Sequence, residues 1–316
     1  MLLPEPECLN DEEVAEIARI PTVPPTGIAN FSTNCYSIAV LQALLSSDAF
    51  MEETLRNDSK DVVVKRARKF LANYCNNQSS VNMSFMAISG LLGFTMGSQE
   101  DAVEFHMKFV EKMCPNIPGF PIKFRTDCYT CNTVDTIEQT LPVISLYPSQ
   151  CDESSVTLED LLNSTFKTFH KIDGTCACGD SKYRCESAIE LKPLIVFSFI
   201  QFQYHQQTAK GSGKKRSGYT PIWKRITIPR EFDAELLFTE PPKGMKATYR
   251  FVSAVLHRGT TSESGHYLAL ATRKTDSYFV CDDNNVDEVS TFESRFTRRY
   301  VPYMAYYELV TETPKE

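Results

Sequence analysis

The chain changes its hydrophobic pattern about one third of the way along, and this change limits the folds open to it. Residues 35–113 read as helical, with apolar side chains at helical spacing in the segments 35–47, 62–75 and 99–113. From about residue 117 the alternation typical of strands takes over, and after residue 190 most segments read as β. This order predicts an α+β fold in which helical and sheet parts share a cleft.

The expected strands are bounded by turn-forming residues. They cover residues 120–131, 133–147, 194–202, 247–257, 265–273, 277–283 and 303–310. A helix is expected to interrupt them at 157–166, with Thr157 as its N-cap and Asp160 three residues on. The stretch "TAKGSGKKRSG" (208–218) predicts a flexible, basic surface loop.

Composition excludes several classes of protein. The 316 residues contain no run of 18 or more apolar residues, which predicts that no segment spans a membrane. The first 20 residues lack the basic start of a secretory signal, so we expect a cytoplasmic or nuclear setting with reduced thiols. A net charge of −7 argues against nucleic acid as a partner and favours a partner with basic patches.

One cysteine lies where a turn becomes a helix, in "GIANFSTNCYSIAVLQALL". If Cys35 begins the helix, the unpaired N–H groups of the first turn favour its thiolate form, which is the nucleophile. Asn30, on the preceding turn, is a candidate donor to a developing oxyanion. Taken alone, a helix cysteine followed by apolar residues is more often a buried core thiol.

A thiol nucleophile needs a base, and the segment "SGHYLALATR" supplies His266, with Gly265 before it and a strand after it. A glycine there leaves room for a substrate backbone. Asp282 and Asp283 follow sixteen and seventeen residues later, a distance that two strands and a turn bring back beside the histidine. Each feature alone has an ordinary explanation, but their joint occurrence favours a catalytic group.

Eleven cysteines include two tight pairs, which in a reducing compartment indicate metal binding rather than disulfides. Cys128 and Cys131 have the spacing of a zinc knuckle. Cys176 and Cys178 are one residue closer together, and Cys185 is a further candidate. The preferred set is Cys128, Cys131, Cys176 and Cys178 around a structural Zn²⁺, and the alternative is four reduced thiols without metal.

Several of these segments resemble the sequence boxes of the ubiquitin-specific proteases. "GIANFSTNCYSIAVLQ" is similar to the family's cysteine box, and "SGHYLALATR" with "SYFVCDDNNV" is similar to its histidine box. "QEDAVEF" resembles the helix segment between them, and "LKPLIVFSFIQF" and "WKRITIP" resemble two later segments. The matches follow the family's order from about Gly27 to Leu309.

The resemblance implies a papain-like arrangement of thumb, palm and fingers. The expected parts are an extension at 1–26 and a catalytic domain at 27–316, with a helical thumb at about 27–115. The β fingers are expected within about 116–200 and the β palm at about 190–316. The family reading gives the following roles: Cys35 as nucleophile, His266 as general base, Asp282 as the residue orienting His266, Asp283 as its support, and Asn30 as oxyanion donor.

The implied reaction is hydrolysis of the peptide or isopeptide bond after the C-terminal glycine of ubiquitin, with no cofactor in catalysis. Asp101 and Glu104 are expected to project from one helix face and dock arginines near ubiquitin's C-terminus, and Gly265 to wall the channel for its tail. Ser32 stands where the family prefers glycine. That departure keeps open the alternative of a catalytically weak or inactive ubiquitin-binding module. A protease for a ubiquitin-like modifier such as SUMO is a further alternative.

Overall fold

The computed structural model describes residues 8–76, 79–95, 97–117, 119–151, 153–208, 215–222, 224–261, 264–274, 277–292, 295–296 and 300–310. Helices fill the first third of the chain, as the helical pattern predicts. They are α1 (Asp11–Arg19), α2 (Cys35–Leu44), α3 (Asp48–Arg56), α4 (Val62–Ala72), α5 (Ser79–Leu91) and α6 (Ala102–Met113). Short 3₁₀ turns follow α1, as η1 (Ile20–Thr22), and α4, as η2 (Tyr74–Asn76).

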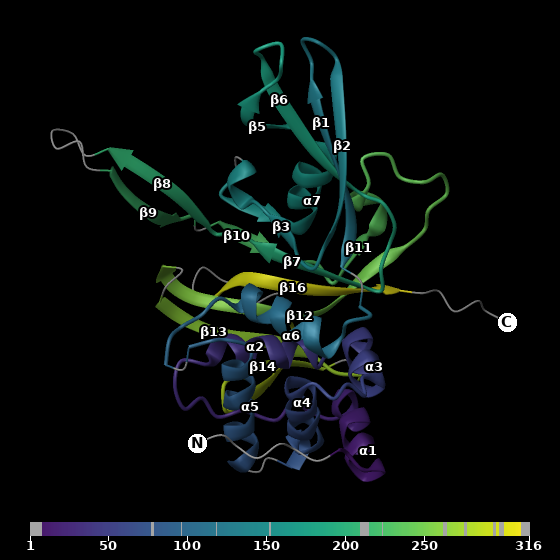
Figure 1. Ribbon diagram of the computed structural model, residues 1–316, viewed down its shortest axis with the longest axis vertical. Helices are drawn as coiled ribbons and strands as arrows, with labels where there is room; N and C mark the ends of the chain where they lie inside the picture. The colour runs from purple at the N-terminus through teal and green to yellow at the C-terminus, as the bar shows by residue number, and fades with distance from the viewer. Residues whose placement is uncertain are drawn as a thin grey trace.

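A mixed sheet lies beside these helices and forms the body of the molecule (Figure 1). Its order is β15-β14-β13-β12-β16-β7-β3, with β11 paired to β12. The strands are β3 (Ile144–Leu146), β7 (Leu194–Phe199), β11 (Glu231–Asp233), β12 (Thr248–Thr261), β13 (Ser264–Thr272), β14 (Tyr278–Asp282), β15 (Asn285–Val289) and β16 (Val301–Val310). The β3–β7 pair is parallel and the other pairs are antiparallel.

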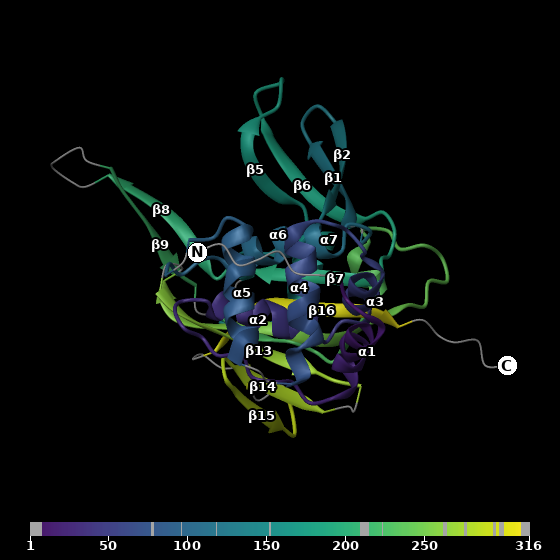
Figure 2. The ribbon, with the colours of Figure 1, turned by 60° about the horizontal axis from the view of Figure 1, so that its bottom comes forward.

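A second sheet projects from the body on the side away from the helices (Figures 1 and 2). Its order is β2-β1-β6-β5. The strands are β1 (Phe120–Cys128), β2 (Thr133–Leu141), β5 (His170–Thr175) and β6 (Ser181–Ala188), with α7 (Leu158–Lys167) at their base. Short elements complete this half: η3 (Pro148–Gln150), η4 (Ala234–Leu237), the pair β4 (Ser155–Thr157) and β10 (Arg225–Thr227), and the ribbon β8 (Phe202–Thr208) and β9 (Lys215–Pro221).

The two faces of the large sheet bury different cores. Successive side chains of a strand point to opposite faces, and β13 follows this rule. Tyr267, Ala269 and Ala271 join the core shared with the helices. Leu268 and Leu270 join the core on the other face, under α7. The sheet is therefore a wall between two hydrophobic cores, and its edge is where helices and sheet can share a site.

Helix α2 lies between the other helices and the sheet, and all ten of its residues are buried. Gln42, a polar residue in it, is fully satisfied. Its Nε2 donates to Thr26 O at 2.7 Å, and its Oε1 accepts from Tyr74 Oη at 2.7 Å. Tyr74 Oη also accepts from Thr26 N at 2.9 Å. These bonds fasten the extended segment that leads into the Cys35 turn.

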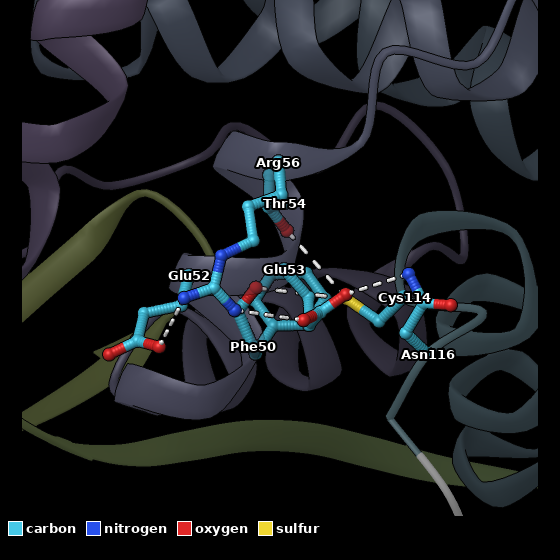
Figure 3. A network of polar contacts seen from close by, with 7 residues as sticks. All are labelled: Phe50, Glu52, Glu53, Thr54, Arg56, Cys114 and Asn116. Carbon is cyan, nitrogen blue, oxygen red and sulfur yellow. Dashed lines mark hydrogen bonds and ion pairs between the residues drawn. The ribbon is translucent and has the colours of Figure 1, made fainter.

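Helix α1 packs against α4, with Ile17 and Ile20 fully buried in the core of the helical half. Helix α3 is joined to the end of α6 through the network of Figure 3. There Cys114 Sγ lies 3.8 Å from Thr54 Oγ1, and Asn116 Nδ2 donates to Glu53 Oε2 at 3.2 Å. Burial raises the pKa of Cys114 to about 12, so this thiol has a packing role.

The local predictions have different outcomes. The expected N-cap is confirmed, because Thr157 caps α7 in a capping box with Asp160. The expected strand 194–202 divides instead into β7 and β8. The expected flexible, basic loop at 208–218 is wrong at both ends, because Thr208 pairs with Lys215 in the β8–β9 ribbon. The alternation in these strands is too weak for the sequence pattern to detect, and residues 209–214 lie outside the described part of the chain.

Within the described ranges, no helix combines the length and apolar character needed to cross a bilayer.

Candidate active site

Cys35 is the first residue of α2 and is only 4% exposed. Helix α2 packs along β13, so its N-terminus lies beside the start of that strand, where His266 is found. The first-turn N–H groups of a helix favour an anion at this position. The described structure therefore brings together the thiol and the imidazole, which are separated by 230 residues of chain.

His266 lies between Asp282 and Cys35. Its Nε2 lies 2.5 Å from Asp282 Oδ1, and Cys35 is the group that most strongly raises the pKa of its ring. Since Nε2 faces the carboxylate, Nδ1 is the nitrogen left for the sulfur. The pairing of β13 with β14 delivers Asp282, as the two-strand spacing predicts.

The electrostatics of this trio favour a charged histidine. Cys35 and, to a smaller extent, Asp282 raise the pKa of His266 to about 9, against the opposing effect of burial. At neutral pH the imidazole of His266 is therefore in its charged form. The other thiol and imidazole nearby are poor substitutes, because burial raises the pKa of Cys281 to about 12 and lowers the pKa of His257 to about 4.

The turn before Cys35 is held by Asn30. Its Oδ1 accepts from Ser32 N at 3.2 Å and from Asn34 N at 3.1 Å. Ser32 does not have a positive φ, so the serine carries no backbone strain where the family prefers glycine. The amide of Asn30, rather than a glycine, sets the shape of this turn.

Asp283 has a different position from the one expected for it. Its Oδ2 accepts from Asn30 Nδ2 at 3.1 Å, and its backbone oxygen accepts from Ile28 N at 2.9 Å. Its carboxylate lies within 4.8 Å of the ring nitrogen of His266 but bonds to Asn30. Asp282 thus holds the imidazole and Asp283 holds the Asn30 turn.

Gly27 allows these two segments to meet. A Cβ at this position would lie 2.2 Å from Asn284 O, well inside van der Waals contact. Gly265 has a similar constraint, because a Cβ there would lie 2.4 Å from His257 Nε2. Packing within its own chain therefore requires a glycine at position 265, in addition to the role in the substrate channel that the sequence leads us to expect.

The sequence predicts that Asp101 and Glu104 project from one helix face, but only Glu104 lies within the helix α6. Asp101 is the N-cap of α6, and its Oδ1 accepts from Val103 N at 2.7 Å. Its Oδ2 accepts from the Tyr303 hydroxyl of β16. Glu104 lies in the first turn, is exposed, and pairs with Lys108 at 2.8 Å. Both carboxylates remain at the surface.

Two polar residues beside the histidine were not found by sequence reasoning. Tyr303 anchors Asp101, and Gln99 Oε1 accepts from Gly265 N at 3.2 Å. Gln99 opens the "QEDAVEF" segment, so its proximity to Asp101 was the available signal. Its partner lies 166 residues away, and local spacing gives no indication of that contact.

The four cysteines of the two close pairs meet at the tip of the finger sheet. Their sulfur atoms all lie within 4.8 Å of one another. Cys128 Sγ lies 3.6 Å from Cys178 Sγ, and Cys131 Sγ lies 3.5 Å from Cys176 Sγ. Thiolates at about 2.3 Å around a tetrahedral Zn²⁺ are separated by about 3.8 Å, so the cluster fits this metal.

The two loops that carry these sulfurs are shaped for the cluster. Asn132 and Gly179 have positive φ angles of 56° and 89°, which turn the chain sharply after each cysteine pair. Gly179 N donates to Cys176 O at 2.8 Å, and this turn accommodates the shorter Cys-x-Cys spacing. Cys185 is elsewhere, buried at the finger base with its sulfur 3.8 Å from Thr239 Oγ1.

The model of the family described as "Ubiquitin carboxyl-terminal hydrolase" matches residues 26–307. The chain belongs to the ubiquitin carboxyl-terminal hydrolase family. The resemblance noted in the cysteine and histidine boxes is confirmed, and Cys35 and His266 both lie inside the matched region.

Curated relatives carry the family name. "Ubiquitin carboxyl-terminal hydrolase 36" of Drosophila erecta is 26% identical over 329 residues, which cover 90% of this chain and 28% of the relative. "Ubiquitin carboxyl-terminal hydrolase 25" of Arabidopsis thaliana is 22% identical over 330 residues, 89% of this chain and 47% of the relative. The chain thus spans less than half the length of these hydrolases.

Solved structures share the fold. The "SAGA Ubp8/Sgf11/Sus1/Sgf73 DUB module bound to ubiquitin aldehyde" matches with a TM-score of 0.72 and 16% identity, over 93% of this chain and 70% of that chain. The same module bound to monoubiquitin matches with a TM-score of 0.71. The expected mixed helix and sheet fold, an arrangement of thumb, palm and fingers, is confirmed.

Proposed function

We propose that this chain hydrolyses the peptide or isopeptide bond after the C-terminal glycine of ubiquitin, with Cys35 as nucleophile. The observation that carries the proposal is a group of three side chains: Cys35 at a helix start, His266, whose pKa is raised most by Cys35, and Asp282 on the Nε2 atom of His266. A thiol, a base and an orienting group in hydrogen-bond reach are the minimum for this chemistry.

The proposed reaction follows from the charges of this trio. The Cys35 thiolate attacks the carbonyl carbon of the C-terminal glycine, and a C–S bond forms. His266, charged up to a pH of about 9, gives its proton to the leaving amine as the C–N bond breaks. The neutral His266 then takes a proton from water, which attacks the thioester and releases ubiquitin and the Cys35 thiolate.

Asn30 is the proposed oxyanion donor. One N–H of its Nδ2 bonds to Asp283, which leaves the second N–H for the oxygen of the tetrahedral intermediate. Because Asn30 Oδ1 is held by two backbone N–H groups, the amide has no freedom to rotate. A donor fixed before the reaction stabilises the transition state without reorganisation.

Ubiquitin recognition is proposed for the acidic edge of α6. Glu104 is exposed, and its ion pair with Lys108 is of the weak surface kind that an incoming arginine can replace. Asp101 is exposed beside it. Arginine guanidinium groups match carboxylates in a bidentate way. The DUB module of similar fold is bound to monoubiquitin, which supports ubiquitin as the substrate here.

A structural Zn²⁺ is proposed for Cys128, Cys131, Cys176 and Cys178. When bound, the metal would hold the two loops at the finger tip together, and catalysis has no need of it. The sulfur positions support this set, and a chain in which the four thiols stay reduced without metal is the alternative. Metal analysis of purified protein distinguishes the two, with one zinc per chain as the expected result.

The function is tested with ubiquitin that carries a C-terminal electrophile. Wild-type protein is expected to form a covalent adduct, and Cys35→Ala is expected to form none. Circular dichroism and thermal melting of both proteins establish that each is folded. A folded wild-type protein that is not labelled would contradict the proposal.

The same reagents separate the two alternatives. Binding of ubiquitin without labelling or turnover would support a non-catalytic binding module. Faster turnover of a SUMO substrate than of a ubiquitin substrate would support a protease for that modifier. The relaxed backbone at Ser32 removes the main reason to expect an inactive turn.

A further inference from the structure

A pocket of about 350 Å³ lies at the opposite end of β13 from His266. Its lining includes Thr272, the last residue of β13, and Arg273, which follows it. His266 lies six residues before Thr272 on the same strand, and at about 3.4 Å per residue this separates the two by about 20 Å. The pocket is therefore separate from the candidate active site.

Positive charge predominates in the lining of this pocket. The cationic side chains that line it are Arg230, Arg250, Arg273 and Lys274. The carboxylates that line it are Asp48 and Glu308. Four positive and two negative charges give the lining a net charge of +2. The backbone oxygen of Arg230 accepts from Phe251 N at 2.7 Å, which holds Arg230 beside β12.

Arg273 is the buried cation of this group, with 5% of its surface exposed. Its Nη1 donates to Ser46 Oγ at 2.7 Å and to Thr272 O at 2.8 Å, and both partners also line the pocket. Its Nε and Nη2 are buried and have no acceptor among the described residues. Buried donors are nearly always paired, so two unpaired donors on one cation indicate an acceptor that comes from outside the chain.

The two unpaired atoms are the pair that a guanidinium uses to hold an anion side-on. Nε and Nη2 donate along one edge of the planar group. Arg125 in the finger sheet shows this use, because its Nε and Nη2 donate to the two carboxylate oxygens of Asp127 at 2.9 and 3.0 Å. The same edge of Arg273 therefore has the geometry to hold two oxygens of one anion.

The carboxylates of the pocket are engaged with other partners. Glu308 Oε1 accepts from Ala49 N at 3.0 Å, at the start of α3. Asp48 pairs with Lys274 at 3.1 Å, and both side chains are more than half exposed. Exposed pairs of this kind add little stability, so an incoming anion can compete for Lys274. In the part of the chain that the structure describes, neither carboxylate bonds to Arg273.

We propose that this pocket binds a phosphate group, two of whose oxygens accept from Nε and Nη2 of Arg273. A phosphate monoester carries nearly two negative charges at neutral pH, which match the net charge of the lining. Arg250 and Lys274 add attraction from the exposed side, since the pair of Arg250 with Glu231 at 2.8 Å is also a surface pair. Free phosphate and a phosphorylated side chain present the same oxygens, and both are ligands of this class.

The test measures binding of inorganic phosphate and of O-phosphoserine to the full chain by calorimetry, in chloride buffer of constant ionic strength. Wild-type protein is expected to bind with one site per chain. Arg273→Lys keeps the charge but lacks the two-donor edge, so affinity is expected to fall at least about tenfold. Arg250→Gln and Lys274→Gln are on exposed side chains, and each is expected to weaken binding about threefold.

Arg125→Lys is the matched control. It makes the same substitution and removes the same two-donor edge in the finger sheet, outside the pocket. Its affinity for phosphate is expected to stay within about twofold of wild type. Thermal melting with and without phosphate gives a second readout, because a ligand that binds the folded state raises the melting temperature whatever the starting stability. Phosphate should raise it in wild type and in Arg125→Lys, and not in Arg273→Lys.

The two probes distinguish the source of the phosphate group. Tighter binding of O-phosphoserine would assign the pocket to a phosphorylated side chain, and tighter binding of inorganic phosphate would assign it to the free ion. If Arg273→Lys does not fold, the double variant of Arg250→Gln and Lys274→Gln decides, with an expected loss of about tenfold. No binding of either probe to folded wild-type protein would overturn the inference, as would unchanged affinity in folded Arg273→Lys or in the double variant.

Discussion

The catalytic end and the finger tip both join distant segments, but different interactions hold each together. At the catalytic end, residues 27–35 meet residues 265–284 over a wall of buried side chains, and the polar groups are fixed by hydrogen bonds between them. At the finger tip, almost the whole of β2 is exposed, and four sulfur atoms converge with little core beneath them. The first region is stabilised by packing, whereas a zinc cross-link is proposed for the second.

This difference explains why the two regions tolerate departures from the family pattern differently. At the Cys35 turn, a serine replaces the preferred glycine, and Asn30 and Asp283 supply the missing constraint through hydrogen bonds. At the finger tip, the shorter Cys176–Cys178 spacing is accommodated by a glycine in a left-handed turn. At the catalytic end, neighbouring side chains make up for the missing glycine. At the finger tip, the conformation of the loop makes up for the shorter cysteine spacing.

The largest expected effect is on turnover, and it distinguishes the catalytic end from the finger tip. Cys35→Ser should lower kcat for a fluorogenic ubiquitin substrate by roughly 10⁶-fold, because the poorer nucleophile stops the reaction at its first step. Cys178→Ser should lose zinc and lower the melting temperature while leaving most of the turnover. A large loss of turnover in Cys178→Ser, with the thumb and palm still folded, would show that the regions are not independent.

The next effect concerns the Asn30 turn. Asn30→Ala should lower kcat by roughly 10²–10³-fold, since it removes an oxyanion donor. Asp283→Ala, which acts through Asn30, should cost about tenfold, the effect of one lost hydrogen bond. The double variant should be no worse than Asn30→Ala alone, because both act on one bond. Additive losses would mean that Asp283 has a second role.

A smaller effect is expected in the pH profile. His266 keeps its proton up to a pH of about 9, and the protonated form is the one that pairs with the thiolate and protonates the leaving amine. We therefore expect kcat/KM to fall as pH rises past about 9. Asp282→Asn removes one contribution that raises this pKa, so the basic limb should move to lower pH. A limb that stays in place would contradict the role of Asp282.

The smallest effect is expected on the reactivity of the Cys35 thiol when the proposed zinc is removed with a chelator. Chelation should expose the finger loops to proteolysis near residues 129–134 and 176–180. The rate at which iodoacetamide alkylates Cys35, measured by peptide mass spectrometry, should change less than about twofold, because the four cysteines lie on the β2-β1-β6-β5 sheet, which projects away from α2 (Figure 1). A larger change would show that the fingers influence the catalytic end.

The sequence alone predicted most of the elements and the candidate reactive residues. Local patterns predicted the helical first third, the capping box of Thr157 and Asp160, and the strands that carry His266 and Asp282. The spacing of two strands predicted that Asp282 returns beside His266, and the cysteine pairs predicted a metal cluster. These features depend on residues that are near one another in the chain, or on simple strand geometry. The sequence pattern can therefore predict them.

The tertiary structure decided which polar groups meet across the chain. That Asp283 holds Asn30, that Gly27 lets the turns approach, and that Gln99 holds Gly265 are contacts between segments more than 160 residues apart. Asp101 proved to be a helix cap bonded to Tyr303. Local periodicity does not predict such contacts. They form only after the two hydrophobic cores have packed and fixed the position of the sheet edge between them.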